Sequence, residues 1–234
     1  MADHLPPTAA VPDTGTAAGG AAAQSAAGTA GAAGAPGQER GRRSREEILD
    51  AVVASLLEDG YAATTTMKVQ ERAGVSRGKL LHHFPSKRHL ITDAVRRLAE
   101  QRLDETTLRS REGVPAPSDV PARLAWALEV LWESFFHPNF WAAMETWIAA
   151  RTDPALADEL VAHEKQVLRR VRENIRGLFG EEIAAHPQYR AMVDVVFTSM
   201  RGMAITYMFS RRDPRTEPMR STWLTSARAL LELE

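Results

Sequence analysis

The chain has no cysteine among its 234 residues. This absence excludes disulfides, thiolate metal sites and cysteine nucleophiles, and nothing indicates an oxidising compartment. No apolar run approaches the roughly 20 residues of a membrane helix, and the amino terminus lacks the basic-then-apolar layout of a signal peptide. We therefore expect a cytoplasmic protein without a membrane partner, stabilised by the packing of its apolar residues, which make up 44% of the chain.

A strong net charge is also missing. The formal net charge is −1, so the total alone indicates neither a nucleic-acid nor a membrane partner. Its distribution is more informative. Between Gly60 and Leu90 a single acid, Glu71, stands among six basic residues, which are Lys68, Arg72, Arg77, Lys79, Lys87 and Arg88.

The chain divides by composition into four parts. Residues 1–40 are rich in Ala, Gly and Pro and offer too little apolar surface to offset chain entropy, which predicts a disordered tail. A partner-binding arm is the alternative. Helical patterns fill residues 41–105 and 122–234, and a connector rich in Pro and Gly occupies 106–121. With no alternating strand pattern and no internal repeat, we expect an all-α fold of about nine helices.

Four helices are expected within residues 41–105. Their predicted caps are Ser44 paired with Glu47 in a capping box, then Thr65 or Thr66, Ser76 and Ser86. The first three should end near Glu58, Ala73 and Phe84, with Gly60 stopping the first. Beyond the connector, five longer patterns cover roughly 123–135, 139–151, 154–179, 189–209 and 216–233.

The turn Ala73-Gly74-Val75-Ser76 joins two short helices, a pattern typical of the helix-turn-helix motif. A recognition helix enters the major groove by its amino-terminal end, so Gly78 would permit close approach while Arg77 and Lys79 reach phosphates or base edges. Phosphates would also meet the hydroxyls and amides near Thr65 and Thr66, and the side chain of Lys87. The alternative is an ordinary surface turn that carries solvated charge.

The sequence around the turn closely resembles the TetR/AcrR family of bacterial transcription regulators. The matching segments are Gly60 to Thr66, Glu71 to Gly78 and His83 to Lys87, and Leu80 and Leu90 also stand at matching positions. The resemblance spans Ser44 to Val95. It implies a homodimer on a palindromic double-stranded DNA operator, with DNA contacts at Thr66, Ser76, Arg77, Gly78, Lys79, His82 and Lys87.

One residue departs from the family pattern. Leu81 stands where relatives usually carry a tyrosine whose hydroxyl meets a phosphate. We expect that contact to be lost or replaced by apolar contact with a sugar or a thymine methyl group, and His82 to take over part of the backbone binding.

Neither a metal nor another cofactor is expected. The spacing of His82, His83 and His89 is poor for one site, because Pro85 interrupts the helix. The basic residues Arg42, Arg43 and Arg45 could form an arm on the DNA groove, and a solvated linker is an equal alternative.

Large apolar side chains gather in two stretches of the second region. They favour an adaptable apolar pocket for a small effector, formed by Trp126, Trp132, Trp141, Met144, Trp147, Phe197, Met200 and Met203. Ordinary core packing is the competing interpretation.

The resemblance further implies that the last two helices pair across a dimer axis as a four-helix bundle. The expected interface residues are Met192, Val196, Tyr207, Trp223, Leu224, Ala227, Leu230 and Leu231. An intramolecular core is again the alternative.

These observations predict a DNA-binding transcriptional repressor that an apolar effector releases from its operator by shifting the fourth helix. An activator or a ligand-blind regulator of the same fold remains open. A helical adaptor and an enzyme using the apolar pocket are distant alternatives, and the sequence shows no nucleophile elbow, paired-metal spacing or phosphate-binding glycine loop.

Overall fold

The computed structural model describes residues 36–109, 113–210 and 212–233. Within these ranges the regular structure is entirely helical, which confirms the all-α prediction. In chain order the helices are α1 (Pro36–Ala63), α2 (Thr66–Ala73), α3 (Arg77–His83), α4 (Lys87–Arg109), α5 (Val120–Ser134), α6 (Pro138–Ala150), α7 (Pro154–Phe179), α8 (Glu181–Ala184), α9 (Tyr189–Thr206), the 3-10 helix η1 (Pro214–Thr216) and α10 (Met219–Leu230).

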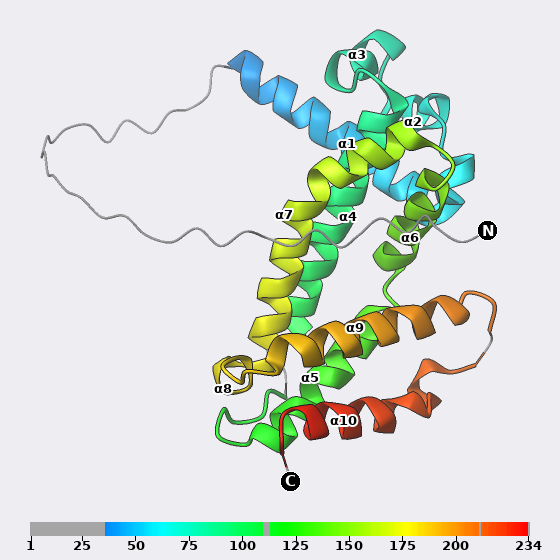
Figure 1. Cartoon of the computed structure of the whole chain (residues 1–234). Helices are drawn as coiled ribbons and strands as arrows, with labels where there is room; N and C mark the ends of the chain where they lie inside the picture. The colour runs from blue at the N-terminus through cyan, green and yellow to red at the C-terminus, as the bar shows by residue number, and fades with distance from the viewer. Residues whose placement is uncertain (1–35, 110–112, 211, 234) are drawn as a thin grey trace, which may run out of the picture.

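The helices form a head and a body joined by two long helices (Figure 1). The head contains α1, α2 and α3 at one end of the molecule, and α5, α8, α9 and α10 lie at the other. Side by side, α4 and α7 run between the two ends and pack extensively on each other. None of the helices in the described ranges is long and apolar enough to cross a membrane.

Packing joins the head to the body. The head's core contains buried side chains of α1 to α4, including Ile48, Val69 and Leu80, and it also takes in Ala150 of α6 and Leu156 of α7. A second core is made by α5 to α10. Helix α4 runs to Arg109 and α5 begins at Val120, so helix occupies both ends of the connector predicted at 106–121. Helices α6 and α7 continue the packing of the head.

Short polar side chains start the head's helices where the sequence predicted. The Thr65 hydroxyl accepts a hydrogen bond from the Lys68 amide at 3.2 Å, and the Ser76 hydroxyl accepts one from the Lys79 amide at 3.3 Å. Ser86 does the same for the His89 amide at 3.2 Å, just before α4. Each cap satisfies one of the free amides of a helix start, so these three boundaries could be read locally.

The predicted start of the first helix is wrong. Helix α1 begins at Pro36, inside the stretch expected to be a tail, and residues 1–35 lie outside the described residues. Ser44 is buried within this helix rather than capping it, and Glu47 accepts from Arg43 at 3.3 Å. Ion pairs three and four residues apart, such as Arg42 with Glu39 and Glu46, support the extra turns.

Gly60 bends the end of α1 and brings it against the body. Its φ of 78° lies in the region that favours glycine. A Cβ atom at this position would lie 2.8 Å from Oε2 of Glu145 on α6. That same oxygen accepts a hydrogen bond from the Tyr61 amide at 2.9 Å, which links the head to the body.

Replacing Gly60 with alanine should therefore destabilise the protein by about 1–3 kcal/mol, because the variant adds both backbone strain and a close contact with Glu145. Urea unfolding of the two proteins measures the difference. The matched control is Gly177→Ala in α7, where a Cβ meets nothing within 4 Å and helix propensity favours alanine. Equal stability of Gly60→Ala and the parent chain would contradict this account of the bend.

Candidate nucleic-acid interface and ligand cavity

The turn between α2 and α3 is built on Gly74. This residue has φ 63° and ψ 33°, and its amide donates to the carbonyl oxygens of Gln70 and Glu71. The Val75 amide also donates to Gln70 O, at 3.1 Å. A left-handed residue at this position closes α2 and lets the chain turn immediately into α3.

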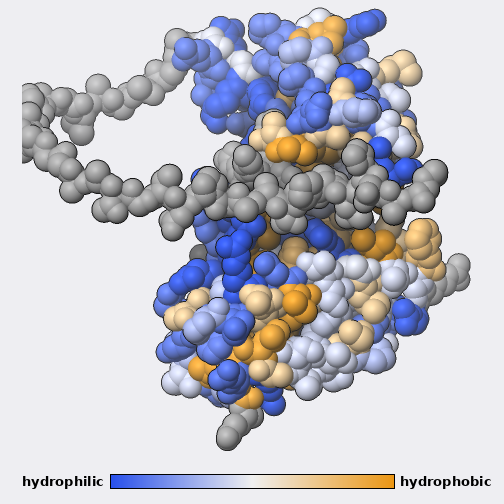
Figure 2. Space-filling view, in the orientation of Figure 1, coloured by the Kyte–Doolittle hydropathy of each residue, from blue (hydrophilic) through white to orange (hydrophobic). Residues whose placement is uncertain are grey.

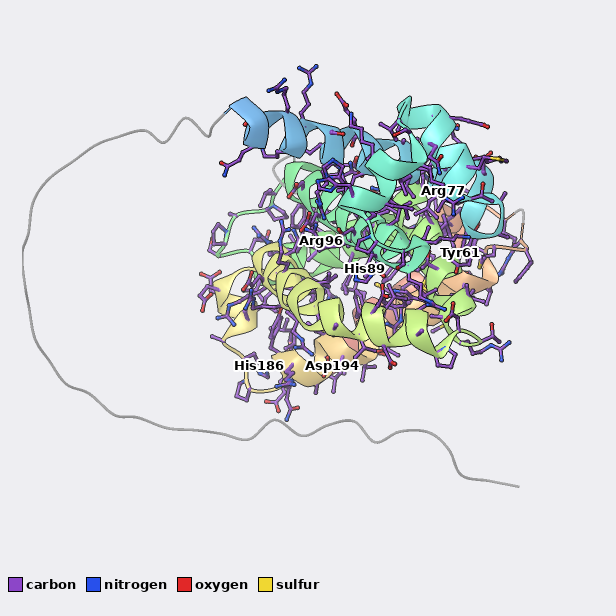
Figure 3. All side chains as sticks on the ribbon, turned by 90° about the horizontal axis from the view of Figure 1, so that it is seen from above. Tyr61, Arg77, His89, Arg96, His186 and Asp194 are labelled. Atoms are coloured by element: carbon purple, nitrogen blue, oxygen red, sulfur yellow. The ribbon has the colours of Figure 1, made fainter. Side chains whose placement is uncertain are left out.

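One face of α3 is buried and the other is open. Leu80 is 1% exposed, and the following Phe84 is also 1% exposed, so both hold the helix on the head's core. The opposite face exposes Arg77, Gly78, Lys79, Leu81 and His82. Figure 3 looks onto the head from above and labels Arg77 on this helix, and Figure 2 shows hydrophilic side chains over much of the head.

The cations of α3 are among the charges of this surface that have no carboxylate partner in the described residues. Neither Arg77 nor Lys79 has a carboxylate partner within the described part of the chain. By contrast, Lys68 lies 3.5 Å from Asp59, and Arg72 lies 2.6 Å from Glu58. The cations of α3 are therefore available to an external anion, whereas those of α2 are already paired.

The other predicted contact residues surround α3. Thr65, Ser76 and Lys87 are exposed and Thr66 is half-buried. The Lys87 ammonium lies 5.3 Å from the ring centroid of Tyr61, a contact that the sequence analysis missed. Because Tyr61 belongs to the bent end of α1, it positions Lys87 beside α3.

The histidines and the arginines of the suggested basic arm interact with groups inside the head or on α4. Burial lowers the pKa of His83, and the nearby His82, Lys79 and Arg45 lower it further. His89 pairs with Ser86 rather than with the other histidines. Of the suggested basic arm, Arg42 and Arg43 bind glutamates of α1, and Arg45 binds Asp93 and lies over the Phe84 ring.

A cavity of about 290 Å³ lies among α4, α6, α7 and α9. Three of the eight predicted pocket residues border it, namely Met144, Trp147 and Phe197. Much of the remaining lining comes from α4 and α7, including Val95, Ala99, Leu103, Leu160, Val167 and Val171. Aromatic content does not point to these residues, although the apolar stripe of α4 is visible in the sequence.

The other predicted pocket residues lie elsewhere. Trp132 is buried in the body, packs on Trp223 at 4.8 Å and donates from Nε1 to Pro214 O at 2.9 Å. Together with Trp126 it also borders a more polar hollow of about 870 Å³. Trp141, Met200 and Met203 belong to the body's core or pack against it.

Most of the residues predicted for the dimer interface are buried within the single chain. These are Met192, Val196, Tyr207, Trp223, Ala227 and Leu231, whereas Leu224 and Leu230 are half-buried. The stripe therefore forms the contact between α9 and α10 and their own body, which is the alternative that the sequence left open.

Comparisons with known proteins agree with this geometry. The profile of the family described as bacterial regulatory proteins, tetR family, matches residues 48–94. The HTH-type transcriptional regulator CymR of Pseudomonas putida is 26% identical over 190 residues, which cover 81% of this chain and 92% of CymR. The HTH-type transcriptional repressor KstR of Mycolicibacterium smegmatis is 43% identical over 72 residues, or 31% of this chain and 35% of KstR.

Solved structures share the fold over about four fifths of the chain. A transcriptional regulator from Rhodococcus sp. Rha1 matches with a TM-score of 0.57 and 20% identity, covering 81% of this chain and 96% of that one. The multidrug binding protein EbrR, complexed with imidazole, matches with a TM-score of 0.55 and 19% identity over the same shares. Residues 48–94 therefore match the tetR family profile, and the chain is similar in sequence to HTH-type transcriptional regulators and in fold to solved regulators.

Proposed function

We propose that this protein is a homodimeric repressor that binds a palindromic operator through α3 and leaves it when a small apolar effector enters the cavity beside α4. The open, uncompensated face of α3 carries this proposal. Arg77 and Lys79 are the exposed cations there, and Gly78 between them adds no side chain that would keep the helix from the duplex.

The contacts divide by role. Arg77 and Lys79 reach base edges or phosphates, and Gly78 allows close approach. The amides and hydroxyls at Thr65, Thr66 and Ser76 face phosphates at the starts of α2 and α3, and Lys87 binds the backbone. His82 and the 42%-exposed Leu81 complete the surface, with Leu81 making apolar contact only.

A second copy is required because two recognition helices must enter successive major grooves, about 34–36 Å apart or a multiple of that distance. The outer faces of α9 and α10 are the surface we assign to it. They expose small or apolar residues, including Val195, Thr198, Gly202, Thr225 and Ala229. Figure 2 shows hydrophobic side chains gathered on the lower body, where Figure 1 places these helices.

Effector release follows from the path of α4. This helix begins at Lys87, directly after α3, and borders the cavity from Thr92 to Leu103. Polar contacts also join these helices. The Tyr61 amide donates to Glu145 of α6, and Arg88 of α4 pairs with Asp153 at the start of α7. A ligand that moves α4 would therefore also move α3. The proposal of repression is supported by the relatives KstR and AcnR, which are named repressors.

The Arg77→Ala variant should lose about 1–3 kcal/mol of binding free energy at the cognate site and relax specificity there, if Arg77 reads a base edge. Selection of sites from random duplex DNA, followed by titration, measures both effects. The control is Arg176→Ala at the far end of α7, which removes the same charge. Unchanged affinity and specificity of Arg77→Ala would show that α3 does not read DNA.

Lys87→Ala should weaken all duplexes about equally, because a phosphate contact carries no sequence information. The slope of log affinity against log salt concentration should fall by about 1 relative to the parent protein. Titrations at several salt concentrations, on cognate and unrelated duplexes, test this. A loss confined to the cognate duplex would contradict the assigned backbone role.

Filling the cavity should separate DNA binding from release. Ala143 borders the cavity from α6, so Ala143→Phe should keep operator affinity while abolishing release by a panel of apolar compounds. Fluorescence anisotropy of a labelled operator reports both properties. Ala155→Phe, at an exposed site on α7, serves as the control. Undiminished release from the filled variant would place the effector elsewhere.

A further inference from the structure

Three arginines, Arg96, Arg102 and Arg201, border the apolar cavity. Arg96 pairs with Glu100 at 3.0 Å and with Asp93 at 3.8 Å. For Arg102 and Arg201, the described residues supply no carboxylate partner. Arg102 borders both this cavity and the more polar hollow, whereas Arg201 borders the apolar cavity. A cation beside an apolar space without a counter-charge is costly to the protein alone and favours an anionic occupant.

Arg102 has one nitrogen unused. Its Nε donates to the Ser134 carbonyl oxygen at 3.0 Å, and its Nη2 donates to the Ser134 hydroxyl at 2.9 Å. Nη1 has no acceptor among the described residues. Burial lowers the pKa of Arg102 to about 10, so the guanidinium remains charged at neutral pH.

Arg102 and Arg201 contact one continuous group of aromatic rings. Arg102 lies 5.2 Å from the ring centroid of Phe135 and 5.1 Å from that of Phe140. Phe135 packs on Phe197 at 5.3 Å, and the Arg201 guanidinium lies 5.9 Å from the Phe197 centroid. Phe140 and Phe197 themselves border the cavity, so positive charge and apolar surface are offered at the same place.

We infer that the cavity binds a compact lipophilic monocarboxylate, with its carboxylate on Arg102, assisted by Arg201, and its apolar body between α4 and α7. The unused N–H groups of the Arg102 fork match the two oxygens of a carboxylate. The inference rests on the proposed effector function, because it names the chemical class that enters the effector cavity.

The size of the cavity limits the ligand. An engineered cavity of about 150 Å³ holds benzene, and the cavity here is about 290 Å³. A bicyclic aromatic acid or a linear acid of about eight carbons therefore has a volume that suits this cavity. Val95, Leu160 and Val171 would contact the apolar body.

A purely structural role for Arg102 is the competing explanation. Ser134 is the last residue of α5, and a cation at the carboxyl end of a helix is stabilising. This role explains the hydrogen bonds of Nε and Nη2, but it explains neither the free Nη1 among the described residues nor the position of Arg201 beside the cavity. Arg123 performs such a role elsewhere, since it lies 5.0 Å from the Trp126 ring centroid and donates to the carbonyl oxygens of Leu178 and Gly177.

Arg123 therefore supplies the matched control, because it borders neither cavity. The test titrates 2-naphthoate and octanoate, each against its carboxamide, into the full-length chain by calorimetry. We expect at least one acid to bind about tenfold or more tightly than its amide, the size of a charge-assisted hydrogen bond. Arg102→Met should reduce that ratio to near one while the amide still binds.

Two further variants separate charge from packing. Arg102→Lys should restore part of the acid preference, and Arg201→Met should reduce it without altering the contacts of Arg102. Arg123→Met should leave the ratio unchanged, whatever it does to thermal stability. The inference is overturned if neither acid is preferred over its amide, or if Arg102→Met weakens acid and amide equally.

Release of the operator is measured separately by fluorescence anisotropy. This measurement tests whether binding of a ligand releases the protein from DNA, independently of which class of ligand binds. Acids that bind with the expected arginine dependence but leave the protein on DNA would support the ligand class and contradict effector release. Release by neutral apolar compounds, with no acid preference, would support the effector proposal and overturn the ligand class.

Discussion

The packing of α4 against α1, α6 and α7 is the constraint on which the rest of the structure depends. One surface of this helix closes the core of the head, with Leu90, Ile91, Ala94 and Leu98 almost completely buried. The residues between and beyond them border the cavity. A single helix thus takes part in both the helix-turn-helix head and the cavity, and its packing connects the two.

Local chemistry explains why the head could be predicted from sequence. The caps at Thr65 and Ser76 and the turn at Gly74 each depend on a few neighbouring residues, and all three lie where the sequence predicted. The left-handed conformation of Gly74 is added by the structure. The start of α1 was missed for a related reason. Ser44 is a good cap by type, but glutamates and arginines on both sides of it form ion pairs that extend the helix toward Pro36.

The body shows where sequence reasoning stops. Composition indicated that aromatic and methionine side chains gather there, but it could not tell which face of each helix meets its own core. Trp132 and Met200 are core residues, whereas Phe197, on the same helix as Met200, borders the cavity. The stripe from Met192 to Tyr207 likewise packs inward, because α10 and α5 cover it within the same chain.

We propose that a ligand in the cavity shifts α4 and so changes the distance between the two α3 helices of a dimer. Because the chain has no cysteine, a Glu71→Cys variant carries a single spin label on the exposed surface of α2. Pulsed dipolar spectroscopy then measures the distance between the labels of a dimer, with and without a saturating releasing compound. The account predicts one defined distance on operator DNA and a shifted distribution with the compound. An identical distribution in both states, or no dipolar signal at all, would contradict it.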